Sequence, residues 1–171
     1  KYNVTVYRPK NIKGLNQIFS RDIAFVVGNM LILPNVIKDR RIEIGALDTL
    51  LSKIQDSNKI KMPEGVRAEG GDVIVCNEHV FVGYSEEEDF QKYKVSRTNR
   101  EGVDFLNDIF PNKKVIGFEL CKSDNNPRIN ALHLDCCFQP IGNNMAILCK
   151  DGFKNQEDVD FLMDYFGESN I

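Results

Sequence analysis

Four acids and one histidine stand at spacings that could support binding or acid–base chemistry. Asp22, Asp72 and Asp135 each precede a short apolar segment, and the intervals between them are comparable. Glu69 lies three residues before Asp72, and His133 lies two residues before Asp135. Acids at equivalent positions of a repeated unit become neighbours around the pseudosymmetry axis. We therefore expect these side chains to surround one site.

A histidine among several carboxylates suits a small cationic ligand, and a guanidinium is the natural candidate. Carboxylates bind a guanidinium through paired, charge-assisted hydrogen bonds. The Glu69-Gly70-Gly71-Asp72 bend lets backbone or ligand approach closely, and His133 and Asp135 would share a face in a strand. Simpler interpretations stay open. An Asp at a hairpin start is often a turn residue, and a His in an apolar stretch is usually a core side chain.

The composition limits the classes of function. The chain has 171 residues, of which 42% are apolar, and a formal net charge of −3. This length allows one domain with a sizeable core, and the charge argues against a dedicated nucleic-acid binder. No apolar run approaches the ~20 residues that span a membrane. We therefore expect a cytoplasmic protein with neither a nucleic-acid nor a membrane partner.

The five cysteines form neither a disulfide pattern nor a metal-binding pattern. Their number is odd, and no two of them have C-x-x-C spacing. Cys136 and Cys137 are adjacent in a strand-like run, so they should point to opposite faces. For this pair, core packing is favoured over a role as nucleophile. We expect reduced thiols, no metal and no organic cofactor.

Three stretches of the chain resemble one another. They start at Arg21 (RDIAFVVGNMLILPN), Gly71 (GDVIVCNEHVFVGYS) and Leu134 (LDCCFQPIGNNMAILCK). Each predicts two short strands joined by a hairpin turn. The turn residues are Gly28-Asn29, Asn77-Glu78 and Gly142-Asn143-Asn144. His79, next to the second turn, is expected on the surface.

A helix is predicted after each hairpin. Apolar residues with helical spacing place the three helices at about 39–55, 98–110 and 155–167. Ile42 belongs to the apolar face of the first, and Thr98 with Glu101 predicts a capping box for the second. Strands are predicted behind the first two helices, at 60–62 and 114–120. The acidic run at 86–89 is interpreted as a solvated loop.

The repeated unit is therefore ββαβ, and the predicted class is α/β. We expect one domain over residues 1–171, with units that start near residues 20, 70 and 133. The third unit stops after its helix, so we expect the chain to be a fragment of a larger ring, whose open sheet edges other units would cover.

Four motifs resemble the arginine deiminase and amidinotransferase superfamily, which includes the dimethylarginine dimethylaminohydrolases. They are Asn16–Asp22 (NQIFSRD), Glu69–Val73 (EGGDV), Ser96–Asn99 (SRTN) and Leu132–Asp135 (LHLD). The resemblance implies the pentein fold, an α/β propeller of five ββαβ units, of which about three are present here. The second and fourth motifs look closer to the deiminase and amidinotransferase branches than to the dimethylarginine hydrolases.

The resemblance also implies chemistry at a guanidino group. A cysteine thiolate attacks the guanidinium carbon, an amine leaves, and water or another amine resolves the covalent intermediate. Carried onto this chain, His133 is the general acid and base, and Glu69 pairs with it or with a substrate nitrogen. Asp22 and Asp135 hold the guanidinium, and Arg97 meets a substrate carboxylate.

The superfamily's nucleophilic cysteine lies near the C-terminus in the last unit, and none of the five cysteines here matches it. We expect the parent protein to be a Cys-dependent amidino hydrolase or amidinotransferase for arginine or a related guanidino compound, and this chain to be inactive alone. The alternatives are a non-catalytic module that binds arginine-like ligands or assembles with partners, and a structural repeat domain whose acids serve in turns, as expected for Asp72. The expected partners are a small guanidino substrate and either a second copy or the rest of the parent chain.

Overall fold

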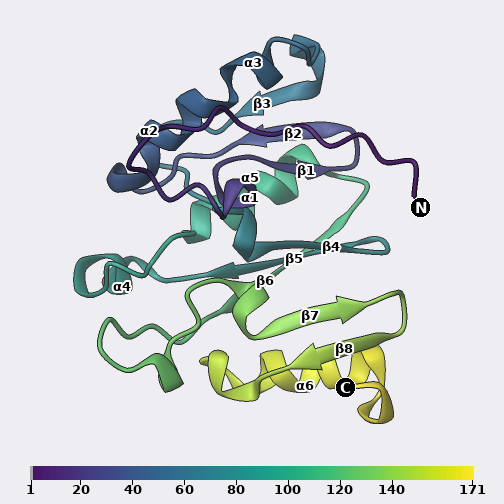
Figure 1. Ribbon diagram of the computed structural model, residues 1–171. Helices are drawn as coiled ribbons and strands as arrows, with labels where there is room; N and C mark the ends of the chain where they lie inside the picture. Colours follow the sequence, from purple (N-terminus) through teal and green to yellow (C-terminus); the bar gives the residue numbers. More distant parts are fainter. Residues whose placement is uncertain (1) are drawn as a thin grey trace.

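The computed structural model describes residues 2–171, which form three successive hairpin units (Figure 1). In the first unit, β1 (Phe25–Val27) pairs antiparallel with β2 (Met30–Leu33). Strand β3 (Lys59–Lys61) then joins β2 in parallel, which gives the order β1-β2-β3. The predicted ββαβ order of this unit is confirmed, although its helical part is irregular.

The second unit repeats this arrangement with longer elements. Strands β4 (Val73–Cys76) and β5 (His79–Tyr84) form an antiparallel hairpin, and β6 (Lys114–Glu119) pairs in parallel with β5. Helix α5 (Arg100–Ile109) makes the crossover between β5 and β6. A short helix, α4 (Glu87–Lys92), precedes it.

The third unit consists of a hairpin and one helix. Strands β7 (Phe138–Ile141) and β8 (Met145–Leu148) pair antiparallel, and α6 (Gln156–Phe166) follows, with Gly167 as its C-cap. In all three units the predicted hairpin is confirmed. Its turn holds a residue in the left-handed backbone region, Gly28, Asn77 or Gly142 (φ of 61°, 53° and 64°), which these residue types adopt most readily.

A short helical turn precedes the first strand of every unit. These turns are α1 (Ser20–Ile23) and two 3-10 turns, Gly70–Asp72 and Leu134–Cys136. Each turn carries one of the repeated aspartates, and the turns of successive units contact each other. Figure 1 shows α1 between the first hairpin and β4. The repeat therefore brings its acids together.

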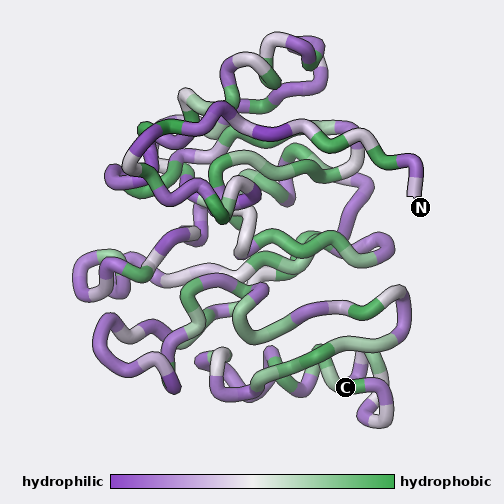
Figure 2. Tube along the Cα trace, viewed as in Figure 1, coloured by the Kyte–Doolittle hydropathy of each residue, from purple (hydrophilic) through white to green (hydrophobic). Residues whose placement is uncertain are grey.

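The core lies on both faces of the second sheet. Along β5, successive side chains point to opposite faces. Val80 and Val82 pack with α5 and the first unit, whereas Phe81 packs with the third hairpin and α6. All six residues of β5 are buried. Figure 2 shows the same pattern, with hydrophobic colour along the central strands and hydrophilic colour in the outer connections.

The first connection differs from the predicted helix over 39–55. The chain forms α2 (Arg41–Ile44) and α3 (Asp48–Leu51), with a 3-10 turn between them. That turn begins at Gly45, and glycine and β-branched residues have low helix propensity. Ile42 was expected on the buried face but is 64% exposed.

The predicted capping box of the second unit is wrong by one residue. Asn99, not Thr98, is the N-cap of α5, and its side chain accepts a hydrogen bond from the N–H of Gly102. The hydroxyl of Thr98 instead donates to Asp72 at 2.6 Å. Because the Thr98 hydroxyl is bonded to the buried Asp72, the side chain of the next residue, Asn99, caps the helix instead.

Two predicted surface features are also wrong. Residues 86–89 do not form a loop alone, since most of them enter α4, where Asp89 is buried and pairs with Lys154 at 2.7 Å. His79 is the first residue of β5, is 6% exposed, and contacts the rings of Phe81 and Tyr165. Aromatic side chains at the end of the hairpin therefore bury a histidine that was predicted to be exposed because it lies next to a turn. Among residues 2–171, no helix has the length and apolar character that a membrane span requires.

Asn99 ties two segments together, and its replacement by Ala should destabilise the fold. Its side chain accepts from the N–H groups of Arg67 and Gly102 and donates to the carbonyl of Gly65. Loss of the cap and of a buried acceptor should cost about 2–4 kcal/mol of unfolding free energy in urea titrations. Asn155→Ala is the matched control, because the Asn155 N-cap of α6 makes no side-chain capping bond. Equal losses in the two variants would contradict this account.

Candidate active site

Equivalent hydrogen bonds join the three helical turns. Asp22 Oδ1 accepts from the backbone N–H of Gly71 at 2.9 Å, and Asp72 Oδ1 accepts from that of Leu134 at 2.9 Å. In both cases the acceptor is the repeated aspartate of one unit, and the donor directly precedes the aspartate of the next. Because these bonds are buried, they fix how each unit sits on its neighbour.

The two glycines before Asp72 are needed for this close approach. A Cβ at Gly70 would lie 2.0 Å from the carbonyl oxygen of Arg21, and one at Gly71 would lie 2.7 Å from the ring of His133. Any side chain would therefore push the first and third units apart from the second. The bend predicted from this sequence motif is confirmed, and it serves backbone approach between units.

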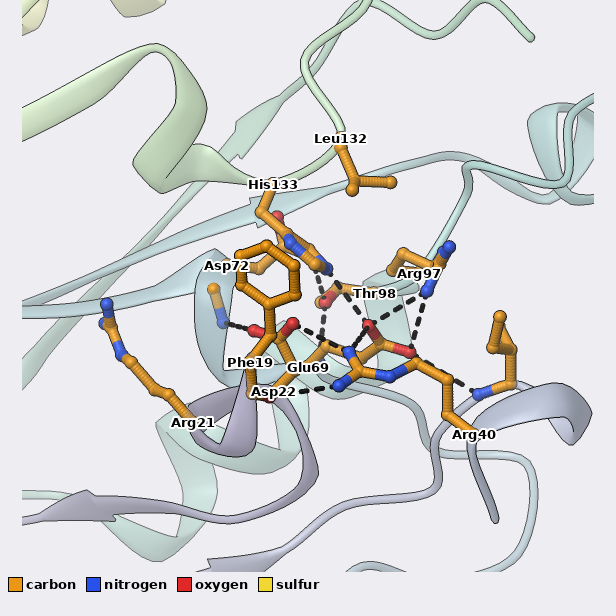
Figure 3. Close-up of polar contacts among 12 residues, drawn as sticks. Phe19, Arg21, Asp22, Arg40, Glu69, Asp72, Arg97, Thr98, Leu132 and His133 are labelled. Carbon is orange, nitrogen blue, oxygen red and sulfur yellow. Dashed lines mark hydrogen bonds and ion pairs between the residues drawn. The ribbon is translucent and has the colours of Figure 1, made fainter. Parts of the chain in front are cut away.

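Glu69 is the centre of the site (Figure 3). Its side chain is fully buried, and Oε2 lies 3.0 Å from Nε2 of His133. Arg97 Nη1 lies 3.2 Å from the same oxygen, and Arg40 Nη1 lies 3.5 Å from it. The backbone N–H of Ile37 donates to the other oxygen at 3.4 Å. One carboxylate thus serves three cationic or ionisable partners.

A guanidinium already lies among the acids of this site. Arg40 Nη1 donates to Asp22 at 2.7 Å, and its Nε and Nη2 donate to the two oxygens of Glu43 at 3.0 and 2.9 Å. Nη2 also donates to the carbonyl of Phe19 at 3.0 Å. The Arg40 side chain is only 14% exposed. The acids therefore hold a planar guanidinium from several sides, and Figure 3 shows Asp22 and Glu69 beside it.

The charges of the site shift its pKa values in opposite directions. Burial alone would raise the pKa of Glu69, but His133, Arg97 and Arg40 together bring it below its usual range. Burial opposes protonation of His133, yet Asp72, Glu69 and Asp22 raise its pKa above the usual value. At neutral pH the arrangement therefore favours an ionised Glu69 beside a His133 that can carry a proton.

The predicted site residues occupy three kinds of position. Asp22, Glu69 and His133 have ligand atoms within 4.8 Å of one another, and all three are buried. Arg97 contacts Glu69. Together with Asp22 and His133, it lines a cavity of about 410 Å³. Asp135 lies at the rim of that cavity, 3.6 Å from Arg21 and apart from the buried cluster.

Asp72 differs from the other repeated aspartates in what it binds. Its oxygens are taken by the Leu134 N–H and the Thr98 hydroxyl, and full burial raises its pKa. These contacts agree with the structural role that we expected for Asp72 from the sequence. The expectation that all three repeated aspartates surround one site holds for Asp22 and, at the rim, for Asp135.

The expected strand through His133 to Cys137 is wrong. Leu134–Cys136 form a 3-10 turn, with His133 directly before it. Cys137 is buried, and Cys136 is exposed and lines the cavity beside His133. Burial raises the pKa of the Cys136 thiol, and the charge of Asp135 acts in the same direction. Neither feature favours a thiolate at neutral pH.

Sequence reasoning missed Arg40 and Glu43. They lie three residues apart, and the turn and short helix after β2 bring both to the acids. The available signal was the mostly basic run Lys38-Asp39-Arg40-Arg41, which directly precedes the predicted apolar face. The same cluster has a metal-like donor set in Asp22, Glu69 and His133. Because the Arg40 guanidinium satisfies both carboxylates there, the set fits a guanidinium better than a metal ion.

Successive ββα(β) units whose junctions carry a buried Asp, Glu and His agree with the pentein class of α/β propellers. The chain belongs to the eukaryotic N,N-dimethylarginine dimethylhydrolase family, since the model of that family matches residues 2–170. The protein YkgA of Bacillus subtilis (strain 168) is 27% identical over 132 residues, which are 77% of this chain and 40% of that protein. The family match corrects the expectation that the chain stands closer to the deiminase and amidinotransferase branches.

Solved structures share the fold at low identity. The dimethylarginine dimethylaminohydrolase (DDAH) of Pseudomonas aeruginosa, a mutant in complex with citrulline, gives a TM-score of 0.58 at 17% identity, over 77% of this chain and 46% of that one. The N-terminal domain of ArgZ, a cyanobacterial arginine dihydrolase bound to its product, gives 0.69 at 16% identity, over 90% and 51%. The chain thus spans about half the length of these relatives, or less.

The two histidines should titrate on opposite sides of the usual value near 6.5. The acids around His133 raise its pKa, whereas burial lowers that of His79. Two-dimensional NMR of the imidazole resonances against pH measures both. Glu69→Gln should lower the pKa of His133 and leave that of His79 unchanged, and Glu168→Gln on the exposed C-terminal turn is the control.

The sign for stability follows from the same shift. Because folding raises the pKa of His133, its protonation stabilises the fold fully below about pH 6.5. This contribution is lost as the pH rises through the folded-state pKa. A His133 that titrates below His79 would refute the assignment of the acid cluster.

Proposed function

We propose that these residues form the guanidino-binding and acid–base part of a cysteine-dependent hydrolase for arginine or a related guanidino compound. One observation carries the proposal. The acids of the site hold the guanidinium of Arg40, which has the functional group of such a substrate. A substrate guanidinium would displace Arg40 and take its place against Asp22 and Glu69.

Family membership and the neighbours support hydrolysis. The family is described as a dimethylarginine hydrolase, and the two neighbours are a dimethylarginine dimethylaminohydrolase and an arginine dihydrolase. Transfer to water rather than to another amine is therefore the reaction that we propose. Arg97, half-buried at the cavity wall, is proposed to bind the substrate carboxylate, with Asp135 at the rim as a second acid for the guanidinium.

In the proposed reaction, His133 moves the protons. A cysteine thiolate forms a bond to the guanidinium carbon as the bond to the departing amine breaks, and protonated His133 gives its proton to that amine. Neutral His133 then takes a proton from water, which attacks the same carbon, and the carbon–sulfur bond breaks to release the thiolate. Glu69 holds Nε2 of His133 and stabilises its charged form.

The nucleophile is proposed to come from outside residues 1–171. Cys136, which lines the cavity, has a raised pKa and lies beside Asp135. Both features make it a poor thiolate. The relatives are about twice as long as this chain or longer, so the chain alone is expected to bind guanidino ligands without turning them over.

Asp22→Asn tests the guanidinium site and should spare the fold. The amide keeps an oxygen that can accept from Gly71 N–H but removes the charge that faces the ligand. Calorimetric titration with arginine, agmatine and N,N-dimethylarginine should show at least about tenfold weaker binding than for the unchanged chain. Lysine, a cation without a guanidinium, should bind neither to the unchanged chain nor to the Asp22→Asn variant.

Exposed Asp151→Asn serves as the matched control, with binding unchanged. Circular dichroism and thermal unfolding check that the Asp22 variant is folded. If the unchanged chain binds no guanidino ligand, or if Asp22→Asn lowers stability without affecting binding, the acids serve only the structural role and the proposal fails.

The NMR signal of Arg40 tests independently whether a ligand displaces the Arg40 side chain from the acids. Its Nε–H is hydrogen-bonded and nearly buried, so its NMR resonance should be visible and shifted at neutral pH. Saturation with agmatine should move this resonance toward the position of an exposed arginine such as Arg128. A bound ligand that leaves the Arg40 resonance in place would show that binding occurs elsewhere.

A further inference from the structure

A second cavity lies on the other side of the segment that carries Arg40. It has a volume of about 780 Å³ and is lined by residues 35–38 and 41 on one wall and by residues 61, 62, 64, 65 and 67 on the other. Arg40 points into the acid cluster, whereas Lys38 and Arg41 line this second cavity. With Lys61 and Arg67 they make four cations on its surface, and we name it the basic groove.

The cations of the basic groove are not paired in salt bridges within the part of the chain that the structure describes. Glu64 is the one acid among the described lining residues. The groove is therefore a local positive field of about +3 on a chain whose net charge is −3.

Arg67 shows that this field reaches below the surface. It is half-buried, and its guanidinium lies 4.8 Å from the centre of the Phe90 ring. Burial lowers the pKa of Arg67, the charges of Arg97 and Arg41 act in the same direction, and the charges of Glu69 and Glu87 act against them. A partly desolvated cation that forms no salt bridge is costly, and a bound anion would offset that cost.

The walls of the groove are already held in place. Asn35 Nδ2 donates to the carbonyls of Pro63 and Val66 at 2.6 and 2.8 Å, which joins the two walls. Asn99 accepts from the N–H of Arg67 and donates to the carbonyl of Gly65, both at 2.9 Å. Because the backbone of the groove is already ordered, ligand binding would cost little conformational entropy there.

We propose that the basic groove binds a phosphate-bearing small molecule with at least two negative charges. Planar guanidinium groups donate paired hydrogen bonds to phosphate oxygens, and lysines add point charges. A monocarboxylate would neutralise only one of the four cations. The site is separate from the acid cluster, so the proposal does not depend on the guanidino-binding function.

Inorganic diphosphate is the probe, titrated calorimetrically into the chain at a fixed ionic strength near 0.1 M, which screens weak surface attraction. The expected result is saturable binding of one diphosphate per chain. The double variant Arg41→Gln/Lys61→Gln should weaken it at least about tenfold, because each lost contact removes a charge-assisted bond. Arg67→Lys keeps the charge but loses the fork, so it should weaken binding about threefold or more.

The matched control is Arg128→Gln/Lys150→Gln, which removes the same charge from exposed positions elsewhere. It should bind diphosphate within about twofold of the unchanged chain. Equal weakening in both double variants would show a general charge effect and overturn the proposal, as would a lack of saturable binding. Citrate, a polycarboxylate of similar charge, is the second probe, and citrate binding as tight as diphosphate would overturn the assignment to phosphate.

Discussion

Buried bonds from the aspartate of one unit to the backbone of the next organise this molecule. Asp22 accepts from Gly71 and Asp72 accepts from Leu134 at equivalent positions, in turns that side chains on Gly70 or Gly71 would force apart. A charged acceptor in a buried position is costly unless it is satisfied. The pairing therefore admits one arrangement of neighbouring units, and it places the residues that follow each turn in one common region.

The site depends on that arrangement for its charge balance. Three carboxylates, those of Asp22, Glu43 and Glu69, face three groups that can be cationic: Arg40, Arg97 and His133. Arg40, Arg97 and His133 come from three different parts of the chain, so no single unit could form the cluster. Because the balance is made with guanidinium groups, the cluster is shaped for a planar cation that donates several hydrogen bonds, and a proton on His133 is stabilised beside it.

One segment separates the acid cluster from the basic groove. Arg40 faces the acids, and its neighbour Arg41 faces the groove with Lys38. A 3-10 turn (Lys38–Arg40) and the short helix α2 carry these residues, and the two adjacent arginines face different cavities. The low helix propensity of Gly45 and Ile42 accompanies a segment whose side chains line two cavities.

The sequence by itself determined the elements whose information is local. The three hairpins, their turns and the ββαβ order follow from alternating apolar residues and turn residues, and the family resemblance implied that Glu69 pairs with His133 or with a substrate nitrogen. Only the tertiary structure decided which hydrogen bonds the repeated acids make, that Asn99 rather than Thr98 caps α5, and that His79 is buried. It also brought Arg40 and Glu43 to the acids. The physical reason is that contacts between distant units decide these features, and such contacts override local propensity wherever a buried charge needs a partner.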